Sequence, residues 1–182
     1  MRRRRAIPKR RRIFLGCEGE SEQAYGRFLN NLAELSGVKV HVVTVNLQPA
    51  GDPHKLAIKA IDARKRLERE GGFVGAALML DIDRLEELPD KGRRVREILI
   101  ESALITIWQV PDHEGFLLRH FRGYEDSILP RGKSFDPLRA EWPTYHKNMA
   151  AMDLQKTLTI DHVRRAEKAC AELTELLKAI GM

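Results

Sequence analysis

Short apolar runs alternate with longer amphipathic segments along the first two thirds of the chain. Runs rich in apolar and β-branched residues lie at 13–17, 38–45, 76–80 and 104–110, and their length predicts strands. Between these runs, apolar residues recur every three or four positions, which predicts helices over 21–36, 53–70 and 88–103 and a further helix beginning at His113. Repeated strand and helix units with short connections predict a parallel sheet covered by helices.

The ends of the first two helices have local signals. Ser21 is predicted to cap the first helix, and Gly37 is predicted to end it. Pro53 is typical of the first turn of the second helix, which Gly71 and Gly72 end. The apolar stripes of both helices would then face the sheet.

Beyond residue 121 the pattern changes twice. Residues 122–158 mix glycine, proline, charged and aromatic residues without a period, which predicts a loop-rich flap. Residues 161–180 regain a helical period, which predicts one helix packed on the core, with a homo-oligomer seam as the alternative use of its apolar stripe. Because 182 residues suit a single core, we predict one domain with a core (13–122), a flap (123–158) and a C-terminal helix (159–182), preceded by a basic tail (1–12).

The positive charge of the chain is concentrated in that tail. The formal net charge is +6, and the tail contributes eight positive charges, which leaves −2 for residues 13–182. A flexible basic arm would neutralise the phosphates of DNA or RNA without reading their sequence, whereas the simpler interpretation is a solvated terminus. The residues predicted to bind nucleic acid are Arg2, Arg3, Arg4, Arg5, Lys9, Arg10, Arg11 and Arg12.

Two observations limit the class of protein. Cys17 and Cys170 lie far apart and have no neighbouring cysteine, so neither a disulfide framework nor a zinc site is indicated, and a reducing cytoplasm is expected. No apolar run approaches the roughly 18 residues that a membrane span needs, so a soluble protein without a membrane partner is expected.

The third predicted strand ends in two carboxylates one residue apart, Asp81 and Asp83. On a strand both would share a face and lie roughly 6.6 Å apart, a spacing that can flank a hydrated divalent cation. A cation would also offset the repulsion between two ionised carboxylates. The alternative is two solvated loop acids after a strand.

Acidic residues follow other strands as well. Glu18 follows the first strand, and Asp112 and Glu114 follow the fourth. In a parallel sheet of order 2-1-3-4, the first and third strands are neighbours, so Glu18 would lie beside the Asp81 end at the carboxyl edge. This convergence favours a metal site over scattered loop acids.

These motifs resemble a known arrangement. The stretch IFLGCEGESE at 13–22, followed by DID at 81–83, resembles the TOPRIM-like pattern of a glutamate after strand one and DxD after strand three. More narrowly, the chain resembles the RloB-like family of restriction-linked phage-resistance proteins, in which a segment NPxFExWLLLHF follows the DxD. Residues 110–121 read VPDHEGFLLRHF, which keeps the Pro, Glu, His and second Phe and departs at the Asn, the first Phe and the Trp. Residues 145–147, YHK, resemble the family's later Tyr/Lys segment, and the likeness covers most of residues 13–158.

The resemblance implies a Rossmann-like, TOPRIM-like three-layer α/β sandwich and a nuclease-like effector of antiviral defence. Such a protein would cleave phosphodiester bonds of DNA or RNA with Mg²⁺ or Mn²⁺, with an ATPase partner, since this sequence has no GxxxxGK[ST] motif. Asp81 and Asp83 would be metal ligands, and Glu18 a ligand or acid–base group. Glu114 would add a carboxylate, and Lys147 and His120 would balance phosphate charge; His120 also fits a core histidine.

Two other functions remain open from the sequence. One is a non-catalytic TOPRIM-like module that docks on an ATPase while the arginine tail binds nucleic acid. The other is a DxD phosphoryl-transfer enzyme with Asp81 as nucleophile and Asp83 as acid–base. The latter is disfavoured, because that chemistry usually places its acids on the first strand and needs a threonine where Arg84 stands.

Overall fold

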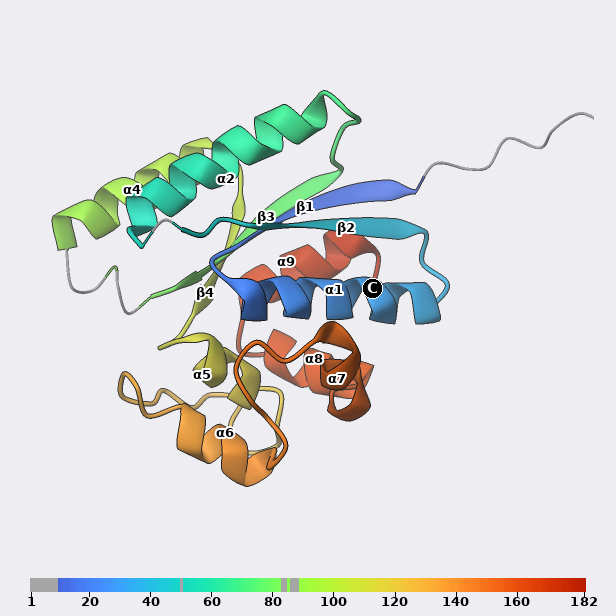
Figure 1. Ribbon diagram of the computed structural model, residues 1–182, viewed down its shortest axis with the longest axis vertical. Coiled ribbons are helices and arrows are strands. Elements are labelled where there is room, and N and C mark those ends of the chain that lie inside the picture. The colour runs from blue at the N-terminus through green and yellow to red at the C-terminus, as the bar shows by residue number, and fades with distance from the viewer. Residues whose placement is uncertain (1–9, 50, 83–84, 86–88) are drawn as a thin grey trace, which may run out of the picture.

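The protein, described here from a computed structural model, is an α/β sandwich built on a four-stranded parallel sheet (Figure 1). The structure describes residues 10–49, 51–82, 85 and 89–182. The sheet order β2-β1-β3-β4 confirms the predicted order. Its strands are β1 (Arg11–Cys17), β2 (Val40–Asn46), β3 (Gly75–Asp81) and β4 (Ile105–Gln109).

Helices cover both faces of this sheet. The helices are α1 (Glu20–Leu35), α2 (Pro53–Glu68), α4 (Pro89–Glu101), α5 (His113–Leu118), α6 (Phe135–Glu141), α7 (Ala151–Thr157), α8 (Ile160–Glu167) and α9 (Ala171–Ile180). Figure 1 shows α2 and α4 on one face of the sheet, and α1 and α9 on the other. The short helices α5 to α8 form a lobe beside α1 and α9.

Strand β1 shows why the strands of this sheet appear in the sequence as continuous apolar runs. Leu15 points into the core cluster that contains the α1 and α9 side chains, whereas Phe14 points into the cluster under α2 and α4. Both side chains are fully buried. A strand covered on both faces has no solvent side, so its sequence need not alternate.

The C-terminal region is more regular than the sequence predicted. The expected loop-rich flap contains α6 and α7, and their residues Leu138 and Leu154 are buried in the same core cluster as the sheet. The expected single helix over 161–180 is two helices, because the chain turns between Lys168, the C-cap of α8, and Cys170, the N-cap of α9. Neither glycine nor proline marks this turn, and the buried positions keep a helical period across it, so periodicity could not reveal the break.

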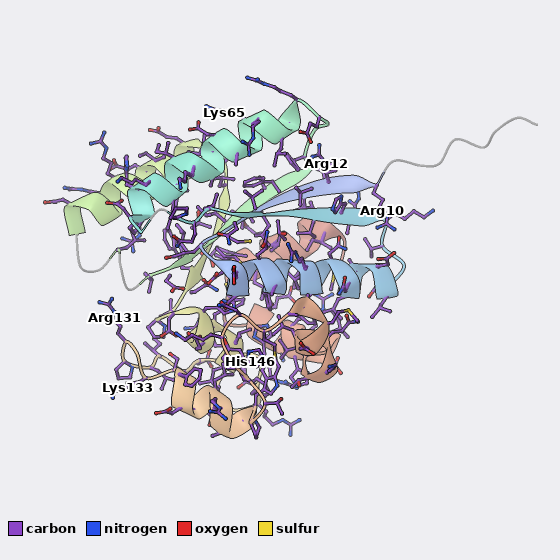
Figure 2. All side chains as sticks on the ribbon, viewed as in Figure 1. Arg10, Arg12, Lys65, Arg131, Lys133 and His146 are labelled. Carbon is purple, nitrogen blue, oxygen red and sulfur yellow. The ribbon has the colours of Figure 1, made fainter. Side chains whose placement is uncertain are left out.

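Strand β1 begins at Arg11, two residues before its predicted start. Arg11 donates to the carbonyl of Ile180 at 2.9 Å, and Arg12 donates to the carbonyls of Leu67 and Gly71. Figure 2 labels Arg10 and Arg12, which lie at the amino end of β1. Residues 1–9 of the predicted arm lie outside the described residues. Of the predicted nucleic-acid-binding residues that are described, two donate to carbonyls of their own chain.

No helix in the described ranges is long and apolar enough to cross a membrane.

Candidate functional site

The candidate site lies at the carboxyl edge of the sheet, between β1 and β3. After β1 the chain runs through α1 to β2 on one side, and β3 leads through α4 to β4 on the other side. The strand order therefore reverses between β1 and β3. In open α/β sheets this position forms a crevice that binds ligands.

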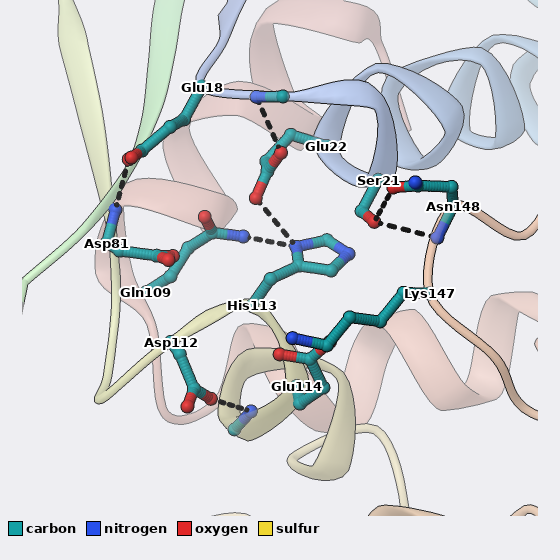
Figure 3. A network of polar contacts seen from close by, with 12 residues as sticks. Glu18, Ser21, Glu22, Asp81, Gln109, Asp112, His113, Glu114, Lys147 and Asn148 are labelled. Atoms are coloured by element: carbon teal, nitrogen blue, oxygen red, sulfur yellow. Dashed lines mark hydrogen bonds and ion pairs between the residues drawn. The ribbon is translucent and has the colours of Figure 1, made fainter. Parts of the chain in front are cut away.

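Glu18 and Asp81 meet at this reversal. The pairing of Cys17 with Met79 brings the ends of β1 and β3 together. One carboxylate oxygen of Glu18 accepts a hydrogen bond from the backbone N–H of Asp81 at 3.2 Å, and the Glu18 side chain is buried (Figure 3). The predicted proximity of the Glu18 and Asp81 ends is confirmed, and Asp83 lies outside the described residues.

Glu22, not Ser21, provides the side chain that bonds to the N-cap residue of α1. The N-cap is Gly19, whose N–H donates to a Glu22 carboxylate oxygen at 2.8 Å, so the prediction that Ser21 caps this helix is wrong. The other Glu22 oxygen lies 3.5 Å from Nδ1 of His113, and both side chains are buried. Glu22 thus links the first helical turn to α5.

Gln109 extends this contact to β3. The register of β3 and β4 pairs Gln109 with Asp81. With the Gln109 amide turned so that each atom has a suitable partner, its nitrogen donates to Asp81 at 3.0 Å and to Glu22 at 3.2 Å, and its oxygen accepts from Nδ1 of His113 at 2.5 Å. Figure 3 draws the opposite amide orientation. Gln109 is fully buried, so satisfying all three contacts matters for stability.

The two acids that follow β4 have different surroundings. Asp112 is the N-cap of α5, and its carboxylate accepts from the N–H of Gly115 at 2.9 Å. Glu114 is buried; it accepts from the hydroxyl of Tyr145 at 3.2 Å and lies 3.8 Å from Nζ of Lys147. Burial and then the Glu114 carboxylate raise the pKa of Tyr145 well above its ordinary value, so this hydroxyl stays a donor at neutral pH.

The loop that carries Lys147 is fixed to α1. Asn148 adopts a left-handed backbone conformation with φ of 59°, and its N–H donates to the hydroxyl of Ser21 at 3.2 Å. The Ser21 hydroxyl also hydrogen bonds to the Asn148 side chain at 3.2 Å. Lys147 itself is 68% exposed, so its ammonium group is available at the rim near Glu114 (Figure 3).

His120, the remaining predicted site residue, lies in the core. It has no exposed surface, and its Nε2 lies 2.8 Å from the hydroxyl of Tyr25. Burial lowers its pKa to about 3. The structure therefore favours the alternative that His120 is a core histidine.

Sequence reasoning missed Gln109 and His113. Gln109 was counted as part of a strand, although a polar residue that ends strand four must lie beside the end of strand three in a 2-1-3-4 sheet. For His113 the available signal was its position: it is the histidine at which residues 110–121 depart from the first Phe of the resembled segment. Together they link the carboxylates of Glu22 in α1 and Asp81 in β3 into one network.

Within the described part of the chain, no three His, Cys, Asp or Glu side chains are arranged to hold a metal ion. What the described rim does provide is a buried Glu18 beside Asp81, a histidine held by two partners, and an exposed lysine above a buried glutamate. Histidine is a residue type that can accept a proton, and an exposed ammonium group can attract a phosphate. Comparisons of this chain with models of protein families, with curated proteins and with solved structures gave no match.

Proposed function

We propose that this protein is a metal-dependent, nuclease-like enzyme that cleaves phosphodiester bonds of DNA or RNA. The observation that carries the proposal is the meeting of Glu18 and Asp81 at the reversal between β1 and β3. The resemblance of residues 13–22 and 81–83 to the TOPRIM-like pattern supports it. The same resemblance supports a role in antiviral defence with an ATPase partner.

The donors at this rim are of the kind that Mg²⁺ or Mn²⁺ prefers. Glu18 and Asp81 offer carboxylate oxygens from adjacent strands, and Asp83 follows two residues later, outside the described residues. These three residues would hold the ion. When bound, the ion would polarise the phosphate and lower the pKa of a coordinated water.

Lys147 would contact the substrate phosphate. Its ammonium group is exposed, and the Glu114 carboxylate lies 3.8 Å away. Because Glu114 also accepts from Tyr145, its position is fixed, and it in turn restricts where Lys147 points. A cation held at the rim offsets the negative charge of a phosphodiester and orients it.

The described part of the basic arm lies at the other end of the sheet. Arg10 and Arg12 mark the amino end of β1, whereas Glu18 follows its carboxyl end. A strand of this length spans roughly 20 Å, so a nucleic acid that contacts both ends would run along the sheet. The arm would supply salt-dependent affinity, whereas the rim would supply the chemistry.

The direct test is cleavage of duplex DNA, single-stranded DNA and transfer RNA by the purified protein, with Mg²⁺, with Mn²⁺ and with a chelator. Glu18→Gln keeps an acceptor for the Asp81 N–H but removes the charge, so we expect a loss of about a hundredfold or more. Glu20→Gln is the matched control, because Glu20 is exposed at the start of α1. No metal-dependent cleavage by the wild type, with or without an ATPase partner, would exclude this function.

The contacts of the described carboxylates favour a second function, a non-catalytic module. The described carboxylates Glu22 and Glu114 already have partners within the chain, and the described residues form no three-ligand group. This suits a non-catalytic module that binds nucleic acid and an ATPase. If Asp81→Ala changes neither Mn²⁺ affinity nor biological activity, whereas deletion of residues 2–9, which precede β1, abolishes activity, the module is the correct function.

A further inference from the structure

We propose that His113 is the general base of the site, and that Glu22 and Gln109 are the residues that position it. In this role Nε2 of His113 takes the proton of the water that attacks the phosphate. The inference rests on the proposed phosphodiester cleavage and assigns one of its steps to a residue outside the carboxylate set.

The first step of the argument is that one ring nitrogen is held as a donor. Nδ1 of His113 lies 2.5 Å from the Gln109 oxygen and 3.5 Å from a Glu22 oxygen. Both partners are acceptors there, so Nδ1 carries the proton. In the neutral ring Nε2 is then the unprotonated nitrogen, which is the form that a general base needs.

The second step is that Nε2 remains open. Among the residues that the structure describes, none hydrogen bonds to this atom, although Nδ1 has two partners. In those ranges, the buried side-chain nitrogen and oxygen atoms that lack a hydrogen-bond partner are Nε of Arg119 and Oγ of Ser134. Nε2 of His113 also lacks a partner but is not one of these buried atoms, so it keeps contact with solvent. Figure 3 shows Nε2 pointing away from Glu22 and Gln109, toward the side where Ser21 and Lys147 lie.

The third step is that the held nitrogen connects the ring to the proposed metal ligands. The Gln109 amide that accepts from Nδ1 also donates to Asp81 at 3.0 Å. Since Gln109 is fully buried and His113 is only 5% exposed, this chain of contacts fixes where the ring lies relative to the end of β3. Nε2 lies on the side of the ring opposite Asp81, toward Lys147 (Figure 3), so the base would act on a phosphate that Lys147 contacts. Fixed orientation is what a base requires to reach a water molecule repeatedly.

The other candidate bases are less suited. Glu18 accepts from the Asp81 backbone and is assigned to the cation. Glu114 is occupied by Tyr145 and Lys147. His120 is sealed in the core.

The step balances with water as the co-reactant. The water oxygen forms a bond to phosphorus while its proton passes to Nε2 of His113. The bond between phosphorus and the ester oxygen breaks, and its electron pair stays on the departing oxygen, which takes a proton from solvent. The imidazolium then returns its proton to solvent, and Glu22 stabilises the transient charge on the ring.

Steady-state kinetics of two variants test the role. His113→Asn keeps a side-chain amide that can donate to Gln109 but has no nitrogen at the Nε2 position, whereas His113→Gln places a polar but non-basic group there. For both we expect kcat to fall about 10²- to 10⁴-fold while KM changes by less than about threefold. His41→Asn, at an exposed position of β2, is the control and should leave kcat unchanged.

The outcomes separate this inference from the function on which it rests. An active wild type whose His113 variants keep kcat, or lose only affinity for substrate, overturns the general-base role alone. A wild type inactive on every substrate and metal overturns the proposed function, and this step with it.

A second measurement needs neither activity nor metal. Two-bond ¹H–¹⁵N correlation spectra of the metal-free protein at pH 8, assigned by comparison with His113→Asn, report which ring nitrogen carries the proton. We expect the proton on Nδ1 and none on Nε2. Protonation on Nε2 alone, or on both nitrogens, would overturn the proposal even if the variants fail to fold.

Discussion

Two histidines stand near the two ends of α5, and both pack against Tyr25. The ring of His113 is 6.5 Å from the Tyr25 ring, and that of His120 is 5.5 Å away. Their polar contacts differ. Nε2 of His120 lies 2.8 Å from the Tyr25 hydroxyl, and its Nδ1 lies 3.2 Å and 3.1 Å from the carbonyls of Phe116 and Leu117. His113 has partners on Nδ1 alone among the described residues.

Burial does not distinguish these two residues, because one is 0% and the other 5% exposed. What distinguishes them is whether the second ring nitrogen has a partner. His120 has both nitrogens bonded to groups of the core and no exposed surface, so it contributes to stability and offers no nitrogen to a substrate. A histidine with one nitrogen held and one open is oriented and still able to accept a proton.

The largest expected effect is the loss of stability in His120→Ala. The substitution leaves a cavity in the core and removes the partner of the Tyr25 hydroxyl, so we expect the free energy of unfolding to fall by about 3 kcal/mol. Urea denaturation measures this change. His41→Ala at an exposed position should stay within about 0.5 kcal/mol. A His120→Ala protein as stable as this control would contradict the assignment of His120 to the core.

The next effect is a fall in stability at acid pH. Burial lowers the pKa of His120 from 6.5 to about 3 in the folded protein. As pH falls below 6.5, the unfolded chain binds this proton and the folded chain does not, so the free energy of unfolding falls until pH reaches about 3. The loss attributable to His120 should be about 2 kcal/mol at pH 5.

Denaturation curves at pH 8 and pH 5 give this difference, and His120→Leu is the matched variant. Leucine cannot take up a proton, so this variant should lose correspondingly less stability between the two pH values. An equal loss in both proteins would mean that other groups cause the acid sensitivity.

The fold was largely predictable because parallel strands buried on both faces have a strong sequence signal. The runs that contain Leu15 and Leu78 are apolar without alternation, and the helices between them have clear periods. The turn before Cys170 was not predictable, since the buried positions Val163 and Leu173 suit one continuous helix equally well. Tertiary packing decides such a turn.

The site was predictable only as far as backbone topology determines it. Glu18 meets the Asp81 end because strand order and parallel direction place both there. The contacts of His113 depend on where α5 begins and on side-chain rotamers, which no spacing in the sequence encodes. For the same reason the sequence left His120 open between a phosphate-binding role and a place in the core until its partners were known.

A smaller effect is expected for Tyr25→Phe, which removes one hydroxyl from the core. Nε2 of His120 then loses its partner at a site without solvent, which should cost about 1.5 kcal/mol of unfolding free energy. Under the proposed function, the cleavage rate should not change, because the hydroxyl bonds to His120 and not to His113. A variant with normal stability and lowered kcat would break the distinction between the two histidines.

The smallest effect tests Asp112, the acid between β4 and α5. Its carboxylate caps α5 through the N–H of Gly115, so Asp112→Ala should cost about 1 kcal/mol and loosen the turn that carries His113. Asparagine caps helices about as well as aspartate, so Asp112→Asn should keep both stability and the cleavage rate. Thermal unfolding and kcat of the two variants separate the possibilities. If Asp112→Asn folds normally but loses activity, the negative charge of Asp112 contributes to the chemistry, and the α5 end of the site extends beyond His113.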